Sequence, residues 1–281
     1  MSNFQQVYEY FTSFQKEKFI EFYIHNTLCG YLKEDFCTLL EQNFSSDFTR
    51  VGHKIFLSNK YSNFQEISMF FESLGKSLHS MKYLELRGEY MPLLSYNNKQ
   101  LIAKIDRRLT NYFGTLSEGI HVNGYVKKPS GVHLWISKRS PFIIDPNSYD
   151  NMVAGGVSFG YSLVETLFKE CLEEANIPAE IVENFTWGYK FRYTLERYAG
   201  IRNDLVYSFN IEIPQNFIPE ALDGEVSNFY LMSLEEVYNL LKTNDNIKFN
   251  SFLVIASFLL NNSNILSIAE RKIINKLAYA Y

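Results

Sequence analysis

Strand-like and helix-like segments alternate through the second half of this 281-residue sequence. In chain order they are strands over 119–126 and 132–138, a helix over 162–175, a strand over 205–213 and a helix over 234–241. The strands carry apolar residues at every second position, whereas the helices carry them at spacings of three and four. This order predicts a mixed sheet with helices packed on its faces.

The first half has a different pattern, and at roughly 150 residues per domain the length predicts two domains. The expected elements of the first half are helices around Phe11–Phe22 and over 63–82, and short strands over 54–57 and around Tyr90. We therefore predict a small α+β unit over 1–114. A second unit over 115–281 would hold the sheet, and its last 30 residues are expected to be helical.

Composition and charge exclude several classes of protein. With 27 Lys and Arg against 31 Asp and Glu, the net charge is −4, whereas nucleic-acid binders take much of their affinity from neutralising phosphates.

The longest apolar run, 252–260, is about half of a membrane span and is expected to form a buried helix. The first residues do not resemble a signal peptide. Cys29, Cys37 and Cys171 match no zinc pattern. We expect a reduced, cytoplasmic protein without nucleic-acid or membrane partners.

Three glutamates share one face of the helix expected over 162–175. Glu170, Glu173 and Glu174 lie at positions i, i+3 and i+4, so their carboxylates repel one another. They also lie toward the end of the helix, where the helix dipole disfavours anions. A divalent cation would relieve both effects, and Mg²⁺ prefers such oxygen ligands. Taken alone, the spacing leaves a solvated acidic face as the alternative.

The same stretch resembles the Nudix box, G-x5-E-x7-R-E-U-x-E-E-x-G-U, where U is aliphatic. Residues 169–177, KECLEEANI, match its second half. Gly155 falls in the first glycine position, Tyr161 replaces the first glutamate, and Lys169 replaces the arginine.

Motifs on both sides of the box resemble one Nudix subfamily, described as thiamin-pyrophosphokinase-related. In chain order they read ELRGEY at 85–90, IDRR at 105–108, GIHVNGYV at 119–126, LWISKRS at 134–140, DNMVAGG at 150–156 and DGEVSNF at 223–229. The resemblance implies a Nudix α/β/α sandwich with a mixed sheet, preceded by a smaller α+β N-terminal domain.

The resemblance also implies a chemistry, the hydrolysis of an organic diphosphate with Mg²⁺ or Mn²⁺. It assigns Glu170, Glu173, Glu174 and the backbone carbonyl of Gly155 as metal ligands. Glu170 and Glu173 would also take part in catalysis, and Glu225 is the candidate general base. Glu165 lies elsewhere on the helix and is expected to be structural.

For the substrate, the resemblance implies thiamin diphosphate or its oxidised or damaged analogues, converted to the monophosphate. Arg139 is a candidate to bind phosphate, and Trp135 a candidate to stack on the organic part. Two alternatives stay open: a hydrolase of oxidised or ordinary nucleoside diphosphates, and a catalytically weak Nudix fold that binds a ligand. The replacements at Tyr161 and Lys169 favour the weak form. The partner is expected to be a small-molecule diphosphate, and the oligomeric state is open.

Overall fold

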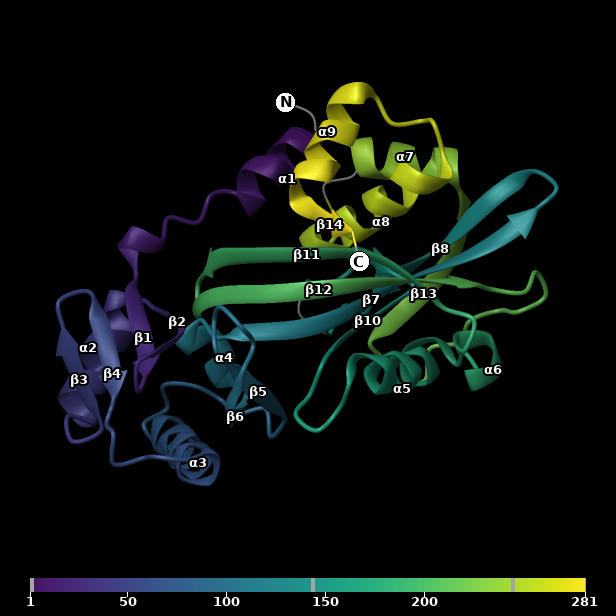
Figure 1. Cartoon of the computed structure of the whole chain (residues 1–281). Helices are drawn as coiled ribbons and strands as arrows, with labels where there is room; N and C mark the ends of the chain where they lie inside the picture. Colours follow the sequence, from purple (N-terminus) through teal and green to yellow (C-terminus); the bar gives the residue numbers. More distant parts are fainter. Residues whose placement is uncertain (1–2, 143–144, 244–245, 281) are drawn as a thin grey trace.

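The strands of the protein form two sheets in the computed structural model, which describes residues 3–142, 145–243 and 246–280 (Figure 1). The smaller sheet has the order β2 (Thr27–Leu32), β1 (Ile20–Ile24), β4 (Lys54–Leu57), β3 (Phe48–Val51). The main path of the larger sheet is β13 (Val226–Ser233), β8 (Gly131–Arg139), β7 (Leu116–Lys128), β12 (Gly200–Glu212), β11 (Thr186–Arg197), β14 (Ala278–Ala280). Three further strands pair with strands of this path: β10 (Val153–Gly156) and β5 (Tyr90–Leu94) with β7, and β9 (Tyr149–Asn151) with β8. Strand β6 (Leu101–Asp106) pairs with β5.

The larger sheet is mixed, as the sequence predicts. β7 runs parallel to β12 and antiparallel to β8, and β11 and β12 form a long antiparallel pair. The three strands predicted in this half are confirmed within β7, β8 and β12, although each is longer than its sequence pattern.

Helices cover both faces of this sheet and make an α/β/α sandwich (Figure 1). One face carries α5 (Leu163–Ala175) and α6 (Ala179–Val182). The other carries α1 (Asn3–Phe11), α7 (Leu234–Thr243), α8 (Phe249–Asn262) and α9 (Ile268–Leu277). Each face has its own apolar cluster between helices and sheet. The apolar run at 252–260 lies in the buried helix α8, as expected. Of the helices in the described ranges, none combines the length and hydropathy that crossing a bilayer requires.

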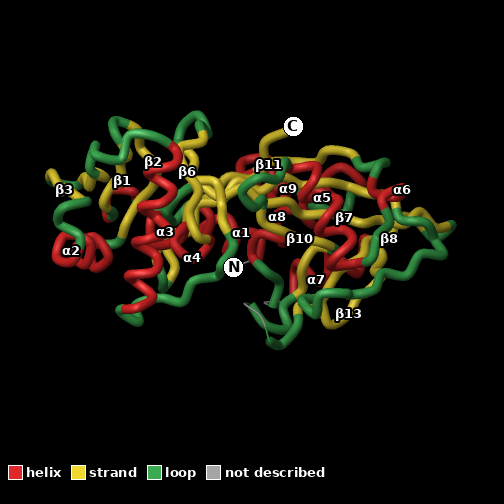
Figure 2. Tube along the Cα trace, turned by 90° about the horizontal axis from the view of Figure 1, so that it is seen from below, coloured by secondary structure: helices red, strands yellow, loops and turns green. Residues whose placement is uncertain are grey.

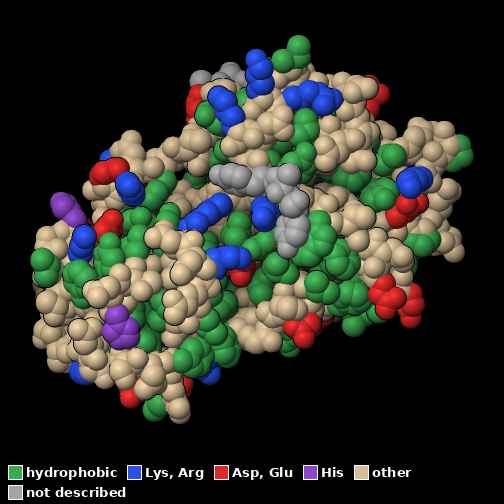
Figure 3. Space-filling view, in the orientation of Figure 1, with side chains coloured by type: hydrophobic (Ala, Val, Ile, Leu, Met, Phe, Trp, Pro, Cys, Tyr) green, Lys and Arg blue, Asp and Glu red, His purple; other side chains and the backbone are tan. Residues whose placement is uncertain are grey.

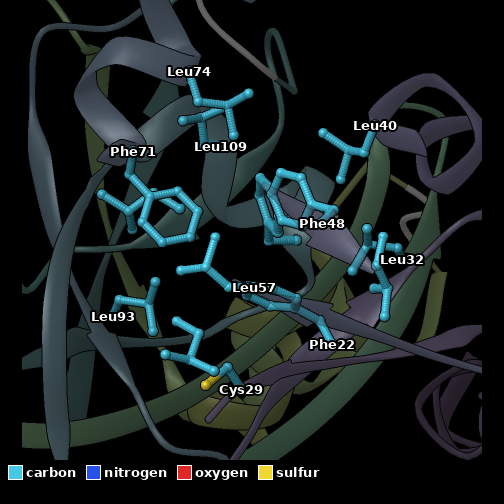
Figure 4. Close-up of a cluster of buried hydrophobic side chains, with 14 of the residues drawn as sticks. Phe22, Cys29, Leu32, Leu40, Phe48, Leu57, Phe71, Leu74, Leu93 and Leu109 are labelled. Carbon is cyan, nitrogen blue, oxygen red and sulfur yellow. The ribbon is translucent and has the colours of Figure 1, made fainter. Parts of the chain in front are cut away.

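The smaller unit lies beside the sandwich, with α2 (Glu34–Asn43), α3 (Phe64–Ser80) and α4 (Arg107–Phe113) around its sheet (Figure 2). Its core includes Phe22 and Phe71 (Figure 4). Phe113 of α4 belongs to the same core. The predicted helix over 63–82 and the predicted strand over 54–57 are confirmed. The helix expected around Phe11–Phe22 is partly wrong: α1 ends at Phe11 and residues 20–24 form β1. Phe22 is buried in the core from that strand, because tertiary packing overrides an ambiguous local spacing.

Two features cross the domain boundary predicted near residue 114. Helix α1 packs against the C-terminal helices, where the rings of Phe4 and Phe252 lie 4.9 Å apart. Strand β5 reaches the larger sheet through Leu94 and Leu116, while its Met91 is buried in the core of the smaller unit. The boundary itself stays a prediction.

Candidate active site

A cleft of about 220 Å³ opens where the smaller unit meets the larger sheet. Its lining comes from α4, β7, β10 and β12, and from the segment that leads into β13. Basic side chains gather at this junction in the space-filling view (Figure 3). Those that line the cleft are Arg107, Arg139, Arg202 and Lys248, and the acidic ones are Glu118, Asp145, Asp204 and Glu225. The lining thus carries four basic and four acidic side chains, which makes the cleft strongly polar.

Two glutamates of α5 contact strand β10, which lines the cleft. The Glu174 carboxylate accepts a hydrogen bond from the backbone N–H of Ala154 at 2.8 Å. The Glu170 carboxyl lies against Gly155, where a β-carbon would stand only 2.7 Å from Oε1 of Glu170. The structure therefore brings Glu170, Glu174 and Gly155 together, three of the four predicted metal ligands.

The ends of α5 are set by its own sequence. The Ser162 hydroxyl accepts a hydrogen bond from the N–H of Glu165 at 3.2 Å, and the Glu165 carboxylate accepts one from the N–H of Ser162 at 2.8 Å. This capping box fixes the first turn. Asn176, with a φ of 51°, ends the helix in the left-handed conformation. Glu165 is thus a capping residue, in agreement with its expected structural role.

The two glutamates beside Gly155 lie in an environment that disfavours their charge. Burial raises the pKa of Glu174 well above its usual range, and repulsion from Glu170 and Asp150 adds to the effect. Burial also raises the pKa of Glu170, and the charge of Glu225 adds to this, although Lys169 acts in the opposite direction. A hard cation at this point would stabilise both carboxylates. The donor set of two carboxylates and a neighbouring backbone carbonyl therefore fits Mg²⁺ or Mn²⁺.

Glu173, the third glutamate of this face, forms an ion pair with Lys169. Its carboxylate lies 2.7 Å from Nζ of Lys169, which also contacts Glu170 at 3.1 Å. The Glu173 side chain is 48% exposed. Within the described residues no three His, Cys, Asp or Glu side chains lie together in a metal-binding arrangement. The assignment of Glu173 as a metal ligand or catalytic group stays a prediction.

Glu225 and Arg139 both line the cleft. Glu225 is exposed, and its charge acts on both Glu170 and Glu174. Arg139 forms an ion pair with the buried carboxylate of Asp150 at 3.1 Å, and Lys248 binds the same carboxylate at 2.8 Å. Arg139 therefore reaches the cleft as part of an ion-paired cluster in which two cations share one carboxylate.

Trp135 is not among the described residues that line the cleft. It lies in β8 and packs against the apolar cluster on the α5 face of the sheet. Trp187 of β11 packs on Phe209 with ring centroids 4.5 Å apart. Burial of large aromatic rings in the core explains both positions. The stacking role predicted for Trp135 has no support from its contacts.

His121, which the sequence analysis does not single out as a site residue, also lines the cleft. Nε2 of His121 accepts a hydrogen bond from the side-chain amide of Asn250 at 3.1 Å, because an amide nitrogen can only donate. Its Nδ1 then donates to Asn151 at 2.8 Å. Burial, with the nearby charge of Lys248, lowers the pKa of His121 to about 4. His121 and Asn151 do lie in two of the motifs that carry the family resemblance, which was the available signal.

Arg107 and Arg202 were also missed as residues of the cleft. Arg107 comes from the smaller unit, and Arg202 is paired with Asp204. Arg107 lies in the IDRR motif at 105–108, but that motif gives no indication of which distant segment its side chain faces.

Two curated relatives match most of the chain, although no protein-family model matches it. The chain is similar to Nudix hydrolase 24, chloroplastic, of Arabidopsis thaliana, with 32% identity over 246 residues, which are 86% of this chain and 67% of the relative. Its similarity to Nudix hydrolase 20, chloroplastic, of the same plant is 30% over 254 residues, or 89% and 67% of the two chains. An uncharacterized protein of Saccharomyces cerevisiae is 31% identical over 183 residues, 60% of this chain and 53% of that one.

Solved structures show a weaker likeness. A protein from Deinococcus radiodurans has a TM-score of 0.45 at 17% identity, and the match covers 60% of this chain and 99% of that one. The Nudix domain of NrtR from Shewanella oneidensis, solved with ADP ribose, has a TM-score of 0.41 at 11% identity and covers 52% and 88% of the two chains.

The fold is an α/β/α sandwich in which an acidic helix packs on a strand that contains two glycines, beside a polar cleft. With two plant relatives matched over two thirds of their length, the chain belongs to the Nudix hydrolase family. It is an enzyme of the Nudix pyrophosphohydrolase type, and the resemblance to the Nudix family is confirmed. The resemblance to the thiamin-pyrophosphokinase-related subfamily stays a prediction. Nudix hydrolases generally use divalent metal ions such as Mg²⁺.

Proposed function

We propose that the protein hydrolyses thiamin diphosphate, or an oxidised or damaged analogue of it, to the monophosphate with Mg²⁺ or Mn²⁺. The subfamily motifs of the sequence support this substrate. The observation that carries the hydrolytic part is the placement of Glu170 and Glu174 against Gly155, next to a cleft lined by basic side chains.

Each residue of the proposed site has a definite task. Glu170, Glu174 and the carbonyl of Gly155 would hold the cation, which when bound neutralises charge on the diphosphate oxygens. Glu225 would accept a proton from the attacking water. The water oxygen then bonds to phosphorus, the bridging P–O bond breaks, and a phosphate group leaves.

Lys169 supports catalytic competence over a weak, binding-only Nudix fold. The box arginine normally holds the glutamates, and Lys169 contacts both Glu170 and Glu173. Tyr161, in the position of the first glutamate, is exposed and supplies no carboxylate. Part of the support for the remaining glutamates therefore comes from the ion pairs of Lys169, because Tyr161 supplies none.

The substrate proposal is tested by a screen of diphosphates with Mg²⁺, in which phosphate or monophosphate release is measured. Thiamin diphosphate, oxidised thiamin diphosphate, ordinary nucleoside diphosphates and 8-oxo-nucleoside diphosphates form the panel. A highest kcat/KM for a thiamin compound supports the proposal. Preference for a nucleotide establishes the alternative substrate class, and binding without turnover establishes the binding-only form.

We also propose a cytoplasmic location, supported by the free, buried state of Cys29, Cys37 and Cys171, which suits a reducing compartment. The names of the two plant relatives carry the word chloroplastic, which describes those proteins. Fluorescence microscopy of the tagged full-length protein in its own cells tests the location.

A further inference from the structure

The smaller unit contributes a basic side chain to the cleft through the first residue of α4. Arg107 lines the cleft together with Thr110 and Asn111 of the same helix. Its position is fixed twice by Glu89, because the backbone carbonyl of Glu89 accepts from the N–H of Arg107 at 2.8 Å and the carboxylate accepts from Nη1 at 2.7 Å. Arg107 is therefore held in one orientation at the edge of the cleft.

Glu89 also ties this arginine to the loop that leads into the acidic helix. The other oxygen of its carboxylate accepts a hydrogen bond from the Ser158 hydroxyl at 2.5 Å. The N–H of Phe159 donates to the carbonyl of Tyr90 at 2.8 Å, and the Phe159 ring stacks on Phe64 of α3 with centroids 5.6 Å apart. The segment between β10 and α5 is thus anchored on the smaller unit.

Arg107 lies close to the glycines that carry the proposed metal site. A β-carbon on Gly156 would stand 3.7 Å from Nη2 and 3.8 Å from Cζ of Arg107, just as one on Gly155 would meet Glu170. Successive residues of a strand face opposite sides. The guanidinium of Arg107 and the carboxylate of Glu170 therefore approach β10 from opposite sides, next to the cleft.

Exposure distinguishes Arg107 from the other basic residues of the cleft, whose side chains are between 11% and 29% exposed. Arg139 and Lys248 share the buried carboxylate of Asp150, and Arg202 is paired with Asp204. In Arg107, Nη1 binds Glu89, whereas Nη2 makes no hydrogen bond to any residue in the described ranges. An exposed ion pair of this kind, with the Arg107 side chain 52% exposed, adds little to stability. A guanidinium with a remaining donor edge is well suited to phosphate oxygens.

We infer that Arg107 binds the diphosphate group of the substrate, and that Glu89 positions it, so that the smaller unit completes the active site. The inference rests on the proposed diphosphate hydrolysis. It assigns a function to the smaller unit, which does not contain the acidic helix. Arg107 is a substrate-binding residue and Glu89 a positioning residue.

The first test compares Arg107→Ala and Arg107→Lys with Arg108→Ala in the full-length protein. Arg108 is adjacent but donates to the Glu85 carbonyl and does not line the cleft. Loss of a charge-assisted hydrogen bond to phosphate should raise KM about 10- to 100-fold with little change in kcat. Lysine should restore part of the loss, and Arg108→Ala should match wild type. Equal KM values for Arg107→Ala and Arg108→Ala would overturn the inference.

The second test separates this inference from the proposed hydrolysis. Binding of imidodiphosphate with Mg²⁺ is measured by calorimetry, without any need for turnover. Arg107→Ala should weaken binding by the same factor as it raises KM, even if no diphosphate of the panel is hydrolysed. A wild-type protein that does not bind imidodiphosphate, or a variant that binds as tightly as wild type, refutes the role of Arg107.

A double-mutant cycle tests the positioning role of Glu89. Glu89→Gln should raise KM and leave kcat nearly unchanged, and Arg107→Ala/Glu89→Gln should be no worse than Arg107→Ala alone. Glu85→Gln, an exposed glutamate of the same segment, is the control. Additive losses in the double variant would mean that Glu89 acts only through the loop at Ser158, which rejects its positioning role.

Discussion

Gly155 and Glu170 are in such close contact that a β-carbon on Gly155 would stand 2.7 Å from the Oε1 atom of Glu170. The glycine is required here by the close approach of a carboxylate, since its φ is not in the left-handed region. The contact joins the strand that lines the cleft to the helix that carries the proposed metal ligands.

Gly155→Ala should therefore displace the Glu170 carboxylate and reduce metal binding and turnover together. We expect kcat/KM to fall about 100-fold, since shifts of about 1 Å at a catalytic group have effects of that size. Gly156→Ala is the matched control, because its β-carbon would meet nothing closer than 3.5 Å. The readouts are steady-state kinetics and a Mg²⁺ titration. If the two alanine variants behave alike, the proposed metal site is in the wrong place.

Metal ions should stabilise the folded protein through the two buried glutamates. Binding of Mg²⁺ or Mn²⁺ to the native state raises the Tm by mass action, and relief of the repulsion between Glu170 and Glu174 contributes to that binding. Glu170→Gln/Glu174→Gln should abolish the shift measured by differential scanning fluorimetry. Glu165→Gln, which changes only the helix cap, should keep the shift at a slightly lower Tm. If the double variant keeps the full metal-induced shift, Glu170 and Glu174 do not bind the metal.

Glu225 should act on the rate of the chemical step. Glu225→Gln should lower kcat about 100-fold or more, with KM nearly constant, if the carboxylate accepts the proton of the attacking water. Glu180→Gln, at an exposed glutamate of α6, is the control. Steady-state kinetics on the substrate identified by the screen gives the answer. An unchanged kcat would move the general base to another residue.

His121 should make the metal-free protein less stable in acid. Its pKa is lowered to about 4 from an ordinary 6.5 by burial, so the unfolded chain binds the proton more readily than the folded one. The stabilisation that this gives is fully present above pH 6.5 and is lost as the pH falls toward 4, about 3 kcal/mol at most. Glu174, with its raised pKa, changes stability in the opposite direction.

The comparison of wild type with His121→Gln isolates the histidine contribution. Urea unfolding at pH 7 and at pH 4.5 should show a difference in unfolding free energy between the two proteins that is larger at pH 7. A difference that is independent of pH would mean that folding does not shift the pKa of His121.

Local sequence was sufficient for α5 and for the order of the strands around it. Ser162 and Glu165 make the capping box within one turn, and the apolar phase of the helix leaves Glu170 and Glu174 on the face toward β10. These features depend on residues within a few positions of one another, so the pattern of residue types specifies them directly. The helix predicted around Phe22 is a strand, β1, in the structure, because the local pattern of apolar residues suited either element.

Tertiary structure alone decided which of these residues share a site. Glu170 lies against Gly155, whereas the half-buried Trp135 packs against the apolar cluster on the α5 face of the sheet. Glu89 meets Ser158 from 69 positions away, and Arg107 reaches the cleft from the smaller unit. Contacts over such separations depend on how two units pack, and the spacing of residues along the chain carries no information about that packing.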